Sequence, residues 1–310
     1  MKQNVLIRCD ASKEIGLGHV TRCLVLAQQF KKDSNKVFFA IRENEIAMKK
    51  LQESGFQYFL PSSNDYNSWL QNITDTQNIN IFIGDVRDGL AKKTIQEFKQ
   101  KGILCVAIDE PSEYAKECDL CFYPPHAQID VNQYKGKVYQ GFEYVLLRDE
   151  FYKTYQKRYN KKPHILVMMG GTDAHNLSYK VVQQLLNTNF NGKISVVINQ
   201  NHPDFTKLSV LSENVKIDSN IDDMAIFLTQ IDFAIITFGV TAYELVAMQV
   251  PSYHICLDDD HYSASKFFEK NGYAKCLNKI DIGDLKDINL SILQKNTITN
   301  IVLKTILTHL

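Results

Sequence analysis

The sequence predicts two doubly wound α/β domains, each built on a parallel sheet. Three observations indicate this class: a length of 310 residues, an alternation of strand-length apolar runs with helix-length amphipathic stretches, and a break in that rhythm near the middle. A chain of this length is long enough for two domains that each bury their own core. Alternating strands and helices are what a parallel sheet with helical crossovers requires.

Each half of the chain contains its own series of apolar runs. In the first half we expect strands at Val5–Cys9, Lys36–Ala40, Gln57–Leu60, Ile79–Gly84, Ile103–Ile108 and Leu120–Tyr123. In the second half we expect them at Ile165–Met169, Ile194–Ile198, Val215–Ile217, Phe233–Ile236 and Tyr253–Cys256. Helices should connect these strands, and apolar residues at helical spacing from Asn289 onward predict one or two further amphipathic helices packed on a sheet.

The segment 151–163 is the predicted domain boundary. It places basic side chains among polar residues without apolar periodicity, which is typical of a solvated linker. We therefore predict an N-terminal Rossmann-like domain over 1–150 and a C-terminal one over 164–310.

The composition favours a small-molecule partner. Lys+Arg and Asp+Glu both total 35, so the bulk charge does not direct the chain to nucleic acid or to an anionic membrane. No run approaches the roughly 20 apolar residues of a membrane span, and the first residues lack a signal-peptide profile. We expect a cytoplasmic protein without disulfides, either a monomer or a weak dimer.

Cys118 and Cys121 have the spacing of metal ligands, but a structural zinc site needs four ligands. The nearest further candidate, His126, lies beyond two prolines. A strand that ends in two half-buried thiols is therefore the preferred interpretation, and we predict neither a metal nor a cofactor.

A glycine-containing loop after the first strand carries the main catalytic candidate. It lies where open α/β sheets bind ligands, and its Gly16 and Gly18 let the backbone approach a ligand closely. The loop lacks the spacing of a dinucleotide fingerprint and of a Walker A motif.

His19 falls in the first turn of the helix that follows this loop, predicted over Val20–Phe30. The positive end of the helix dipole favours the neutral imidazole that a general base requires. A helix-capping histidine explains the position equally well on chemistry alone. Arg22, one turn further, can meet a phosphate or a carboxylate, or can form an ordinary surface ion pair.

Two loops of the second half are candidate phosphate sites. Gly170 and Gly171 follow a buried strand, and Thr172 or Asp173 is placed to cap the next helix. A simple tight turn explains that pattern as well.

Gly239, Val240 and Thr241 open a second helix, whose free backbone N–H groups suit a diphosphate. Glu244 lies one turn inside that helix and can accept hydrogen bonds from ribose hydroxyls, or can merely complement the helix dipole. Further on, the acidic run Asp258–Asp260 before His261 predicts a helix N-cap rather than a metal site.

Taken together, these loops resemble the GT-B architecture of the glycosyltransferase group that contains the peptidoglycan enzyme MurG. In that architecture two Rossmann-like domains face each other across a nucleotide-sugar cleft. The segments Ile15–Arg22, Gln140–Phe151 and Met169–Asp173 are more narrowly similar to the UDP-sugar hydrolases of pseudaminic acid biosynthesis. The resemblance covers nearly the whole chain and implies hydrolysis of a UDP-linked 2,4-diacetamido-2,4,6-trideoxy hexose, with inversion at the anomeric carbon and no metal.

The resemblance also assigns roles to residues. It implies that His19 activates water and that the glycines of its loop approach the substrate. The implied sugar-side residues are Gly16, Gly18, Arg22, Asp85, Arg87, Arg148, Asp260 and His261. The implied nucleotide-side residues are Gly170, Gly171, Thr172, Gly239, Val240, Thr241 and Glu244.

Two positions depart from the family pattern. Arg87 stands near the position where the hydrolases carry a tyrosine, and Asp260 and His261 stand where the fold often has an amide-containing pair. A guanidinium prefers an anionic or strongly accepting group, so the identity of the sugar, and of the nucleotide, stays open. Two other functions also stay open: a glycosyltransferase of the same fold, which needs an acceptor, and a nucleotide-sugar-binding protein without catalysis.

Overall fold

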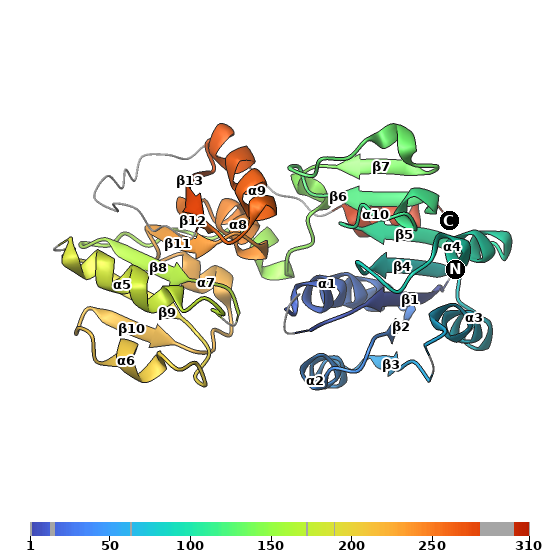
Figure 1. Cartoon of the computed structure of the whole chain (residues 1–310), viewed down its shortest axis with the longest axis horizontal. Helices are drawn as coiled ribbons and strands as arrows, with labels where there is room; N and C mark the ends of the chain where they lie inside the picture. Colours follow the sequence, from blue (N-terminus) through green and yellow to red (C-terminus); the bar gives the residue numbers. More distant parts are fainter. Residues whose placement is uncertain are drawn as a thin grey trace. The chain divides into compact units, whose positions relative to one another are not determined.

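The chain forms two compact units. The computed structural model describes residues 2–12, 16–62, 64–171, 173–188, 190–279 and 301–309. The first unit comprises Met1–Arg148 together with Thr299–Leu310, and the second comprises Asp149–Ile298. Each unit is a parallel sheet with helices packed against it (Figure 1).

The first sheet has the strand order β3-β2-β1-β4-β5-β6-β7, and every described pairing in it is parallel. This order is the doubly wound arrangement, with its switch point between β1 and β4. The strands are β1 (Asn4–Cys9), β2 (Lys36–Ala40), β3 (Gln57–Phe59), β4 (Ile81–Asp85), β5 (Leu104–Ile108), β6 (Leu120–Tyr123) and β7 (Lys137–Gln140).

Helices bury both faces of the first sheet. The helices of this unit are α1 (Gly18–Lys32), α2 (Glu45–Glu53), α3 (Tyr66–Thr76), α4 (Lys92–Gln100) and α10 (Val302–Leu307). Alternate residues of β1 pack into two hydrophobic cores, one on each face of the sheet. Val5 and Ile7 pack with α1, α2 and α10, whereas Leu6 packs with α3 and α4. Because both faces are covered, the central strands are mainly apolar, as buried parallel strands are.

The second sheet has the order β10-β9-β8-β11-β12-β13, again with parallel pairings and a switch point between β8 and β11. Its strands are β8 (His164–Met168), β9 (Lys193–Val197), β10 (Val215–Asp218), β11 (Phe233–Thr237), β12 (Ser252–Cys256) and β13 (Ala274–Lys279). Its helices are α5 (Leu177–Asn187), α6 (Phe205–Ser209), α7 (Met224–Leu228), α8 (Val240–Ala247) and α9 (Asp259–Lys270).

The predicted strands are all present, with ends that shift by a residue or two. The structure adds two strands that the sequence did not indicate, β7 and β13, each at the edge of its sheet. An edge strand is short and partly exposed, so it lacks the continuous apolar run by which the central strands were recognised.

The described residues also form four short 3₁₀ turns. They are η1 (Ala115–Glu117), η2 (Val131–Gln133), η3 (Phe142–Tyr144) and η4 (Asp149–Tyr152).

The second unit differs from the predicted C-terminal domain both where it begins and where it ends. The second unit begins at Asp149, and part of the predicted linker packs on it, since the Arg158 N–H donates to the Thr229 carbonyl at 2.9 Å. The final helix α10 belongs to the first unit, where Val302 and Ile306 are fully buried in its core. Helical spacing indicates that a helix covers a sheet but not which sheet. The remainder of the segment expected to be helical, before Ile301, lies outside the described residues.

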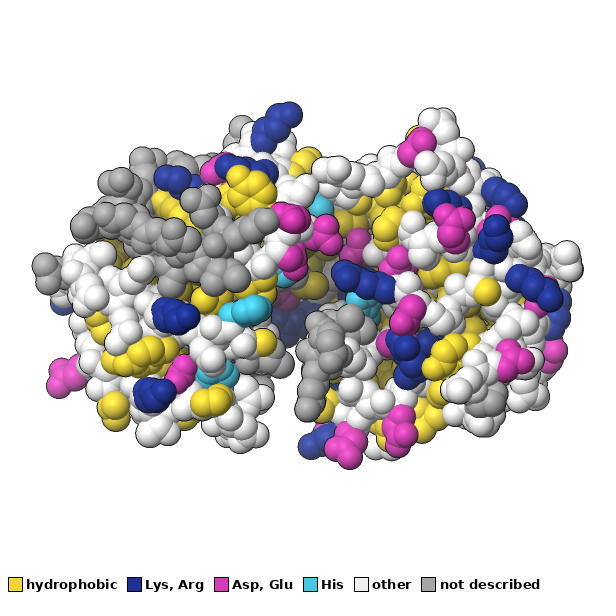
Figure 2. All heavy atoms as spheres, in the orientation of Figure 1, with side chains coloured by type: hydrophobic (Ala, Val, Ile, Leu, Met, Phe, Trp, Pro, Cys, Tyr) yellow, Lys and Arg dark blue, Asp and Glu magenta, His cyan; other side chains and the backbone are white. Residues whose placement is uncertain are grey.

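The surface agrees with the balanced composition. On the face drawn in Figure 2, basic and acidic side chains are interspersed over both units. Within the described ranges, no helix is both long enough and apolar enough to cross a membrane.

Candidate active site

The carboxyl edge of the first sheet carries a buried polar cluster at the switch point. Asp85 is the last residue of β4 and pairs in register with Cys9, the last residue of β1. The loop after β1 leads into α1, which places His19 and Arg22 beside this edge. Asp85 is 0% exposed, so its carboxylate depends on protein partners for every hydrogen bond.

Asp85 fixes the orientation of the His19 ring. The Nδ1 atom of His19 lies 2.6 Å from the Oδ1 atom of Asp85, and the imidazole is 12% exposed. An ionised carboxylate can only accept, so this 2.6 Å contact favours the tautomer with the hydrogen on Nδ1 and the lone pair on Nε2. The Nη2 atom of Arg22 also lies near Nδ1, at the longer distance of 3.0 Å. Within the described part of the chain, Nε2 makes no hydrogen bond and is available to take a proton.

Arg22 holds the same carboxylate from a second side. Its Nε atom donates to Oδ2 of Asp85 at 2.6 Å, and its Nη2 atom donates to Oδ1 at 2.5 Å. Burial by itself raises the pKa of the Asp85 carboxyl, but the charge and hydrogen bonds of Arg22, with a smaller contribution from His19, lower it to about 2. Asp85 is therefore ionised at neutral pH.

Asp109 completes the cluster from the neighbouring strand. It follows β5 directly, and its Oδ2 atom accepts a hydrogen bond of 2.5 Å from Nη1 of Arg22. Two carboxylates therefore surround one guanidinium, and the group has one net negative charge while His19 is neutral.

Tyr114 fixes the end of β4. A Cβ atom added to Gly84 would lie 2.8 Å from the Tyr114 ring, which is closer than side chains pack. The Tyr114 hydroxyl also accepts a hydrogen bond of 3.4 Å from the Val86 backbone N–H. Glycine at position 84 is therefore required for the tyrosine to pack beside the strand end that carries Asp85.

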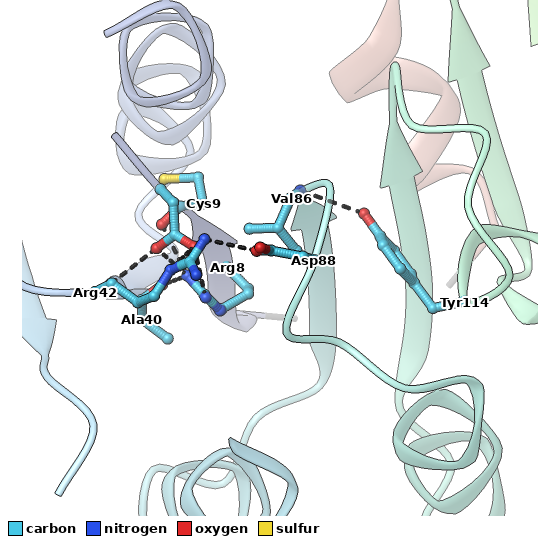
Figure 3. Close-up of polar contacts among 8 residues, drawn as sticks. Arg8, Cys9, Ala40, Arg42, Val86, Asp88 and Tyr114 are labelled. Atoms are coloured by element: carbon cyan, nitrogen blue, oxygen red, sulfur yellow. Dashed lines mark hydrogen bonds and ion pairs between the residues drawn. The ribbon is translucent and has the colours of Figure 1, made fainter. Parts of the chain in front are cut away.

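A second polar network lies on the other side of β1 (Figure 3). Both Arg8 and Asp10 are buried, and their ion pair has distances of 2.5 and 2.7 Å. Asp10 also accepts hydrogen bonds from the backbone and the side chain of Arg42, and Arg42 in turn reaches Asp88 at 2.6 Å. The network ties together the segments that follow β1, β2 and β4.

The other expected sugar-side residues of the first unit have different surroundings. Gly16 has a left-handed φ of 67°, and a Cβ atom added to Gly16 or to Gly18 would meet no other atom of the described residues within 4 Å, so a ligand could approach both. Arg87 is exposed two residues after Asp85. Arg148 lies near Lys50 of α2, where burial and the charge of Arg148 lower the lysine pKa.

The sequence did not single out three residues of this region: Asp109, Tyr114 and Glu110. Glu110 is 6% exposed, and burial raises its pKa to about 7 while the charge of Arg87 opposes that rise. Asp109 and Glu110 directly follow a predicted strand, so the rule that polar residues at strand ends form sites could have found them. Tyr114 gave no such signal.

In the second unit, a residue of the loop after β8 caps the helix that follows, α5. Gly170 has a φ of 79°, a conformation that favours glycine. The Asp173 carboxylate accepts hydrogen bonds from the backbone N–H groups of Leu177 and Ser178 at 2.8 and 2.9 Å. Asp173 therefore caps α5, as the sequence suggested, and those two N–H groups are already occupied. Thr172 lies outside the described residues.

The start of α8 has the more open donors. Gly239 is the N-cap residue, and no side chain caps the helix. The loop adjoins the one after β8, since the Thr237 hydroxyl would lie 3.6 Å from a Cβ atom added to Gly170. The N–H groups at Val240 and Thr241 are thus suited to an anion. Glu244 is buried one turn further along α8.

Asp258 caps α9, as predicted, by accepting a hydrogen bond of 2.7 Å from the His261 backbone N–H. Asp260 is exposed in the first turn of the helix. The His261 ring packs near Phe238 with centroids 6.1 Å apart. This places His261 close to the segment that leads into α8.

Cys118 and Cys121 differ from expectation in their burial. Both are fully buried, and their thiols point to the backbone carbonyls of Tyr114 and Ala115. Burial raises the pKa of both thiols, which disfavours the thiolates that bind metals. Among the described residues, no group of three or more His, Cys, Asp or Glu side chains is arranged to hold a metal ion.

Comparison with known proteins gives named relatives. The UDP-2,4-diacetamido-2,4,6-trideoxy-beta-L-altropyranose hydrolase of Campylobacter jejuni is 27% identical over 280 residues, covering 87% of this chain and 97% of that protein. The spore coat polysaccharide biosynthesis protein SpsG of Bacillus subtilis is 23% identical over 282 residues, covering 87% and 82%. The uncharacterized protein MJ1062 of Methanocaldococcus jannaschii is 29% identical over 276 residues, and the match spans only 54% of its length. No protein family model matches the chain.

Solved structures show the same fold. MurG of Acinetobacter baumannii has a TM-score of 0.65 at 13% identity, covering 91% of this chain and 88% of that one. A glycosyltransferase of kitacinnamycin has a TM-score of 0.68 at 14% identity, with 92% and 88% covered. At these identities the likeness concerns the fold alone. The predicted fold is confirmed, and the chain is a GT-B protein related to the UDP-sugar hydrolase of C. jejuni and to SpsG.

Proposed function

We propose that this protein hydrolyses a UDP-linked diacetamido-trideoxy sugar, releasing UDP and the free sugar. The observation that carries the proposal is the His19–Asp85 pair at the switch point of the first sheet, with Nε2 of His19 left open. The hydrolase of C. jejuni, whose name states this chemistry, aligns with the chain over 97% of its own length. The two units then have separate tasks: the second binds the nucleotide and the first supplies the base.

In the proposed reaction, Nε2 of His19 accepts a proton from a water molecule as the water oxygen attacks the anomeric carbon. The bond from that carbon to the phosphate oxygen breaks, and its electron pair leaves with UDP. Attack opposite the leaving group inverts the anomeric carbon. The proton on His19 then passes to solvent. Asp85 acts as the orienting partner, which keeps the reactive tautomer and stabilises the charge on the ring.

Arg22 has a positioning role in this proposal rather than a substrate-binding one. Its guanidinium is already held by Asp85 and Asp109, at distances of 2.5 to 2.6 Å. A guanidinium that already binds two carboxylates has little attraction left for a phosphate. Its contribution is to keep Asp85 ionised and correctly oriented although that residue is fully buried.

In this proposal the second unit binds UDP, the leaving group. The N–H groups at the start of α8, around Gly239, Val240 and Thr241, would stabilise the diphosphate charge as it develops. Glu244 would accept hydrogen bonds from the ribose hydroxyls. Gly170 and Gly171 would approach the phosphates through their backbone. By the family resemblance alone, Thr172, which lies outside the described residues, is assigned to the nucleotide, and Arg148, Asp260 and His261 are assigned to the sugar or its surroundings.

The direct test is to incubate the protein with UDP-linked diacetamido sugars without any acceptor and to follow UDP and free sugar by NMR. His19→Gln should abolish turnover and leave UDP affinity within about twofold, since the amide cannot act as a base. Release that occurs only with an added acceptor would identify a glycosyltransferase instead. Binding of the sugar nucleotide without turnover by the unaltered protein would identify a binding protein.

A further inference from the structure

Glu110 is a buried acid that the proposed reaction does not use. The residue is 6% exposed, and within the described ranges its carboxyl group makes no hydrogen bond or ion pair. Its backbone is fixed, because its carbonyl accepts a hydrogen bond of 2.7 Å from the Tyr123 hydroxyl. Burying an unpaired carboxyl group costs free energy, and an active-site carboxyl kept in this state is suited to binding a ligand.

Arg87 lies between two residues that have hydrogen bonds of their own. The residue before it, Val86, donates its N–H to the Tyr114 hydroxyl at 3.4 Å. The residue after it, Asp88, is held by Arg42 at 2.6 Å (Figure 3). Arg87 itself is exposed and makes no hydrogen bond or ion pair with any residue that the structure describes. Its side chain therefore projects from a fixed segment two residues beyond Asp85.

The sheet brings the two residues to the same edge. β4 and β5 are parallel neighbours, and Gly84 pairs in register with Ala107. Arg87 lies three residues beyond Gly84, and Glu110 lies three residues beyond Ala107. The two residues therefore belong to the segments that follow two neighbouring strands at the carboxyl edge of the sheet.

The two groups also share an electrostatic environment beside His19. After burial, the nearby charge of Arg87 has the largest influence on Glu110, and the other charged groups that face it are Asp85, Asp109 and His19. Asp85 and Asp109 are both occupied by Arg22. Arg87 and Glu110 thus offer a donor and an acceptor next to the base, and both are available.

A guanidinium and a carboxylate that face a ligand from two sides are complementary to a secondary amide, whose C=O and N–H point in opposite directions. The guanidinium has only donors and can bind a carbonyl oxygen, while the carboxylate has only acceptors and can bind an amide N–H. A sugar hydroxyl has to donate and accept through a single oxygen atom. An acetamido substituent presents its N–H and its carbonyl oxygen as separate atoms on opposite sides of a trans amide, so it can lie between the two side chains.

We infer that Arg87 and Glu110 recognise an acetamido group of the sugar, Arg87 by donating to its carbonyl oxygen and Glu110 by accepting from its N–H. The inference rests on the proposed function and names the part of the substrate that this edge of the first sheet selects. Both residues act here as specificity determinants that contact the substrate, separately from the proton transfer at His19.

The experiment compares three UDP sugars: the 2,4-diacetamido sugar and two analogues in which one acetamido group is replaced by a hydroxyl. For each protein the ratio of kcat/KM between the diacetamido sugar and each analogue is measured. Arg87→Ala and Glu110→Gln should each reduce this ratio for one and the same analogue by roughly 10- to 100-fold, the range for a hydrogen bond to a charged group. Arg87→Lys, which keeps a donor, should retain more of the preference than Arg87→Ala.

Lys93→Ala and Glu113→Gln are matched controls, because both side chains are exposed and belong to segments that follow β4 and β5 in the same unit. Both should keep the ratios of the unaltered protein. If Arg87→Ala and Glu110→Gln lower kcat/KM equally for all three sugars, the residues do not read the acetamido group and the inference is overturned. If the unaltered protein hydrolyses none of the sugars, the proposed function fails and the inference fails with it.

A pH profile gives a readout that a merely structural role would not change. An ionised Glu110 accepts the amide N–H better than a protonated one, so KM for the diacetamido sugar should fall as the pH rises through about 7. In Glu110→Gln that dependence should be absent. A dependence that persists unchanged in the glutamine variant would remove Glu110 from the recognition of the substrate.

Discussion

Nδ1 of His19 lies 2.6 Å from Oδ1 of Asp85, although the two residues are 66 positions apart in the sequence. The contact joins the first turn of α1 to the end of β4 and exists because β1 and β4 are neighbours in the sheet. It determines which nitrogen of the ring carries the hydrogen. The catalytic proposal therefore depends on sheet order as much as on the histidine.

Replacing Asp85 by asparagine tests that contact directly. An asparagine at position 85 can present its NH₂ group to Nδ1, which would move the ring hydrogen to Nε2 and remove the base. We expect kcat for UDP release to fall by roughly 10²- to 10⁴-fold, the range seen when the orienting acid of a catalytic histidine is lost. UDP affinity, measured by calorimetry, should change little. Asp109→Asn is the matched control, since Asp109 contacts Arg22 but not the His19 ring. A normal kcat for Asp85→Asn would refute the role of Asp85.

Arg22 should affect both stability and the pH dependence of activity. Its removal in Arg22→Met leaves Asp85 buried without its main cation, which costs about 3–5 kcal/mol in other buried pairs. The pKa of Asp85 should rise, because Arg22 is the strongest influence that lowers it. The acid limb of the kcat profile should then move to higher pH. Urea unfolding and a kcat–pH profile measure the two effects.

Arg22→Lys provides the comparison for this prediction. A lysine keeps the charge but not the two-pronged contact with the carboxylate, so it should restore part of the stability and part of the profile. Equal profiles for the unaltered protein and the methionine variant would contradict the positioning role.

Glycines 84 and 18 should respond differently to alanine. A Cβ atom at position 84 meets the Tyr114 ring at 2.8 Å, whereas one at position 18 meets nothing within 4 Å. Gly84→Ala should therefore destabilise the fold by about 1–3 kcal/mol, the usual effect of overpacking, and should displace Asp85. Gly18→Ala should leave the melting temperature unchanged within error but raise KM if the substrate approaches the backbone there. Comparable melting temperatures for both variants would contradict the packing argument.

Stability should depend on pH through two carboxyl groups whose pKa values are shifted in opposite directions by folding. Asp85 has a lowered pKa of about 2, so its contribution is complete above the unfolded value near 3.8 and is lost as the pH falls through 2. Glu110 has a raised pKa of about 7, so stability should fall as the pH rises from about 4.5 to 7. Glu110→Gln removes the second dependence only.

The measurement is the free energy of unfolding in urea at a series of pH values. The advantage of Glu110→Gln over the unaltered protein should grow between pH 4.5 and 7 by up to about 3 kcal/mol, since one pKa unit corresponds to about 1.4 kcal/mol. Glu113→Gln, at an exposed position, should show no such growth. Parallel curves for the unaltered protein and Glu110→Gln would contradict the assigned pKa.

The central strands and the position of His19 could be predicted because both depend on local pattern. A continuous apolar run marks a strand that is buried on both faces, and a glycine-containing loop after such a run marks a ligand edge. The partners of His19 could not be predicted in the same way. Asp85 becomes its neighbour only when β4 pairs with β1, and the strand order is not written in any local segment.

The same reason explains the remaining differences. The edge strands β7 and β13 lack an apolar run, and α10 carries the correct amphipathic spacing without any mark of the sheet it covers. Arg22 was expected to meet a carboxylate or a phosphate, and the choice between them required the positions of Asp85 and Asp109 on two further strands. Local sequence patterns therefore do not predict the partners of residues that act through tertiary contacts.

Glu244 gives the sharpest test of the nucleotide side. It is buried in α8, one turn beyond the open N–H groups at Val240 and Thr241, which is a suitable position for accepting hydrogen bonds from two ribose hydroxyls. Glu244→Gln keeps the shape of the side chain but removes its charge and one acceptor. We expect UDP to bind roughly 10-fold more weakly by calorimetry, and 2′,3′-dideoxy-UDP, which lacks both hydroxyls, to bind equally well to the variant and the unaltered protein. Glu213→Gln, at an exposed position of the same unit, should bind UDP normally. Equal weakening for UDP and its dideoxy analogue would mean that Glu244 supports the helix rather than the ribose.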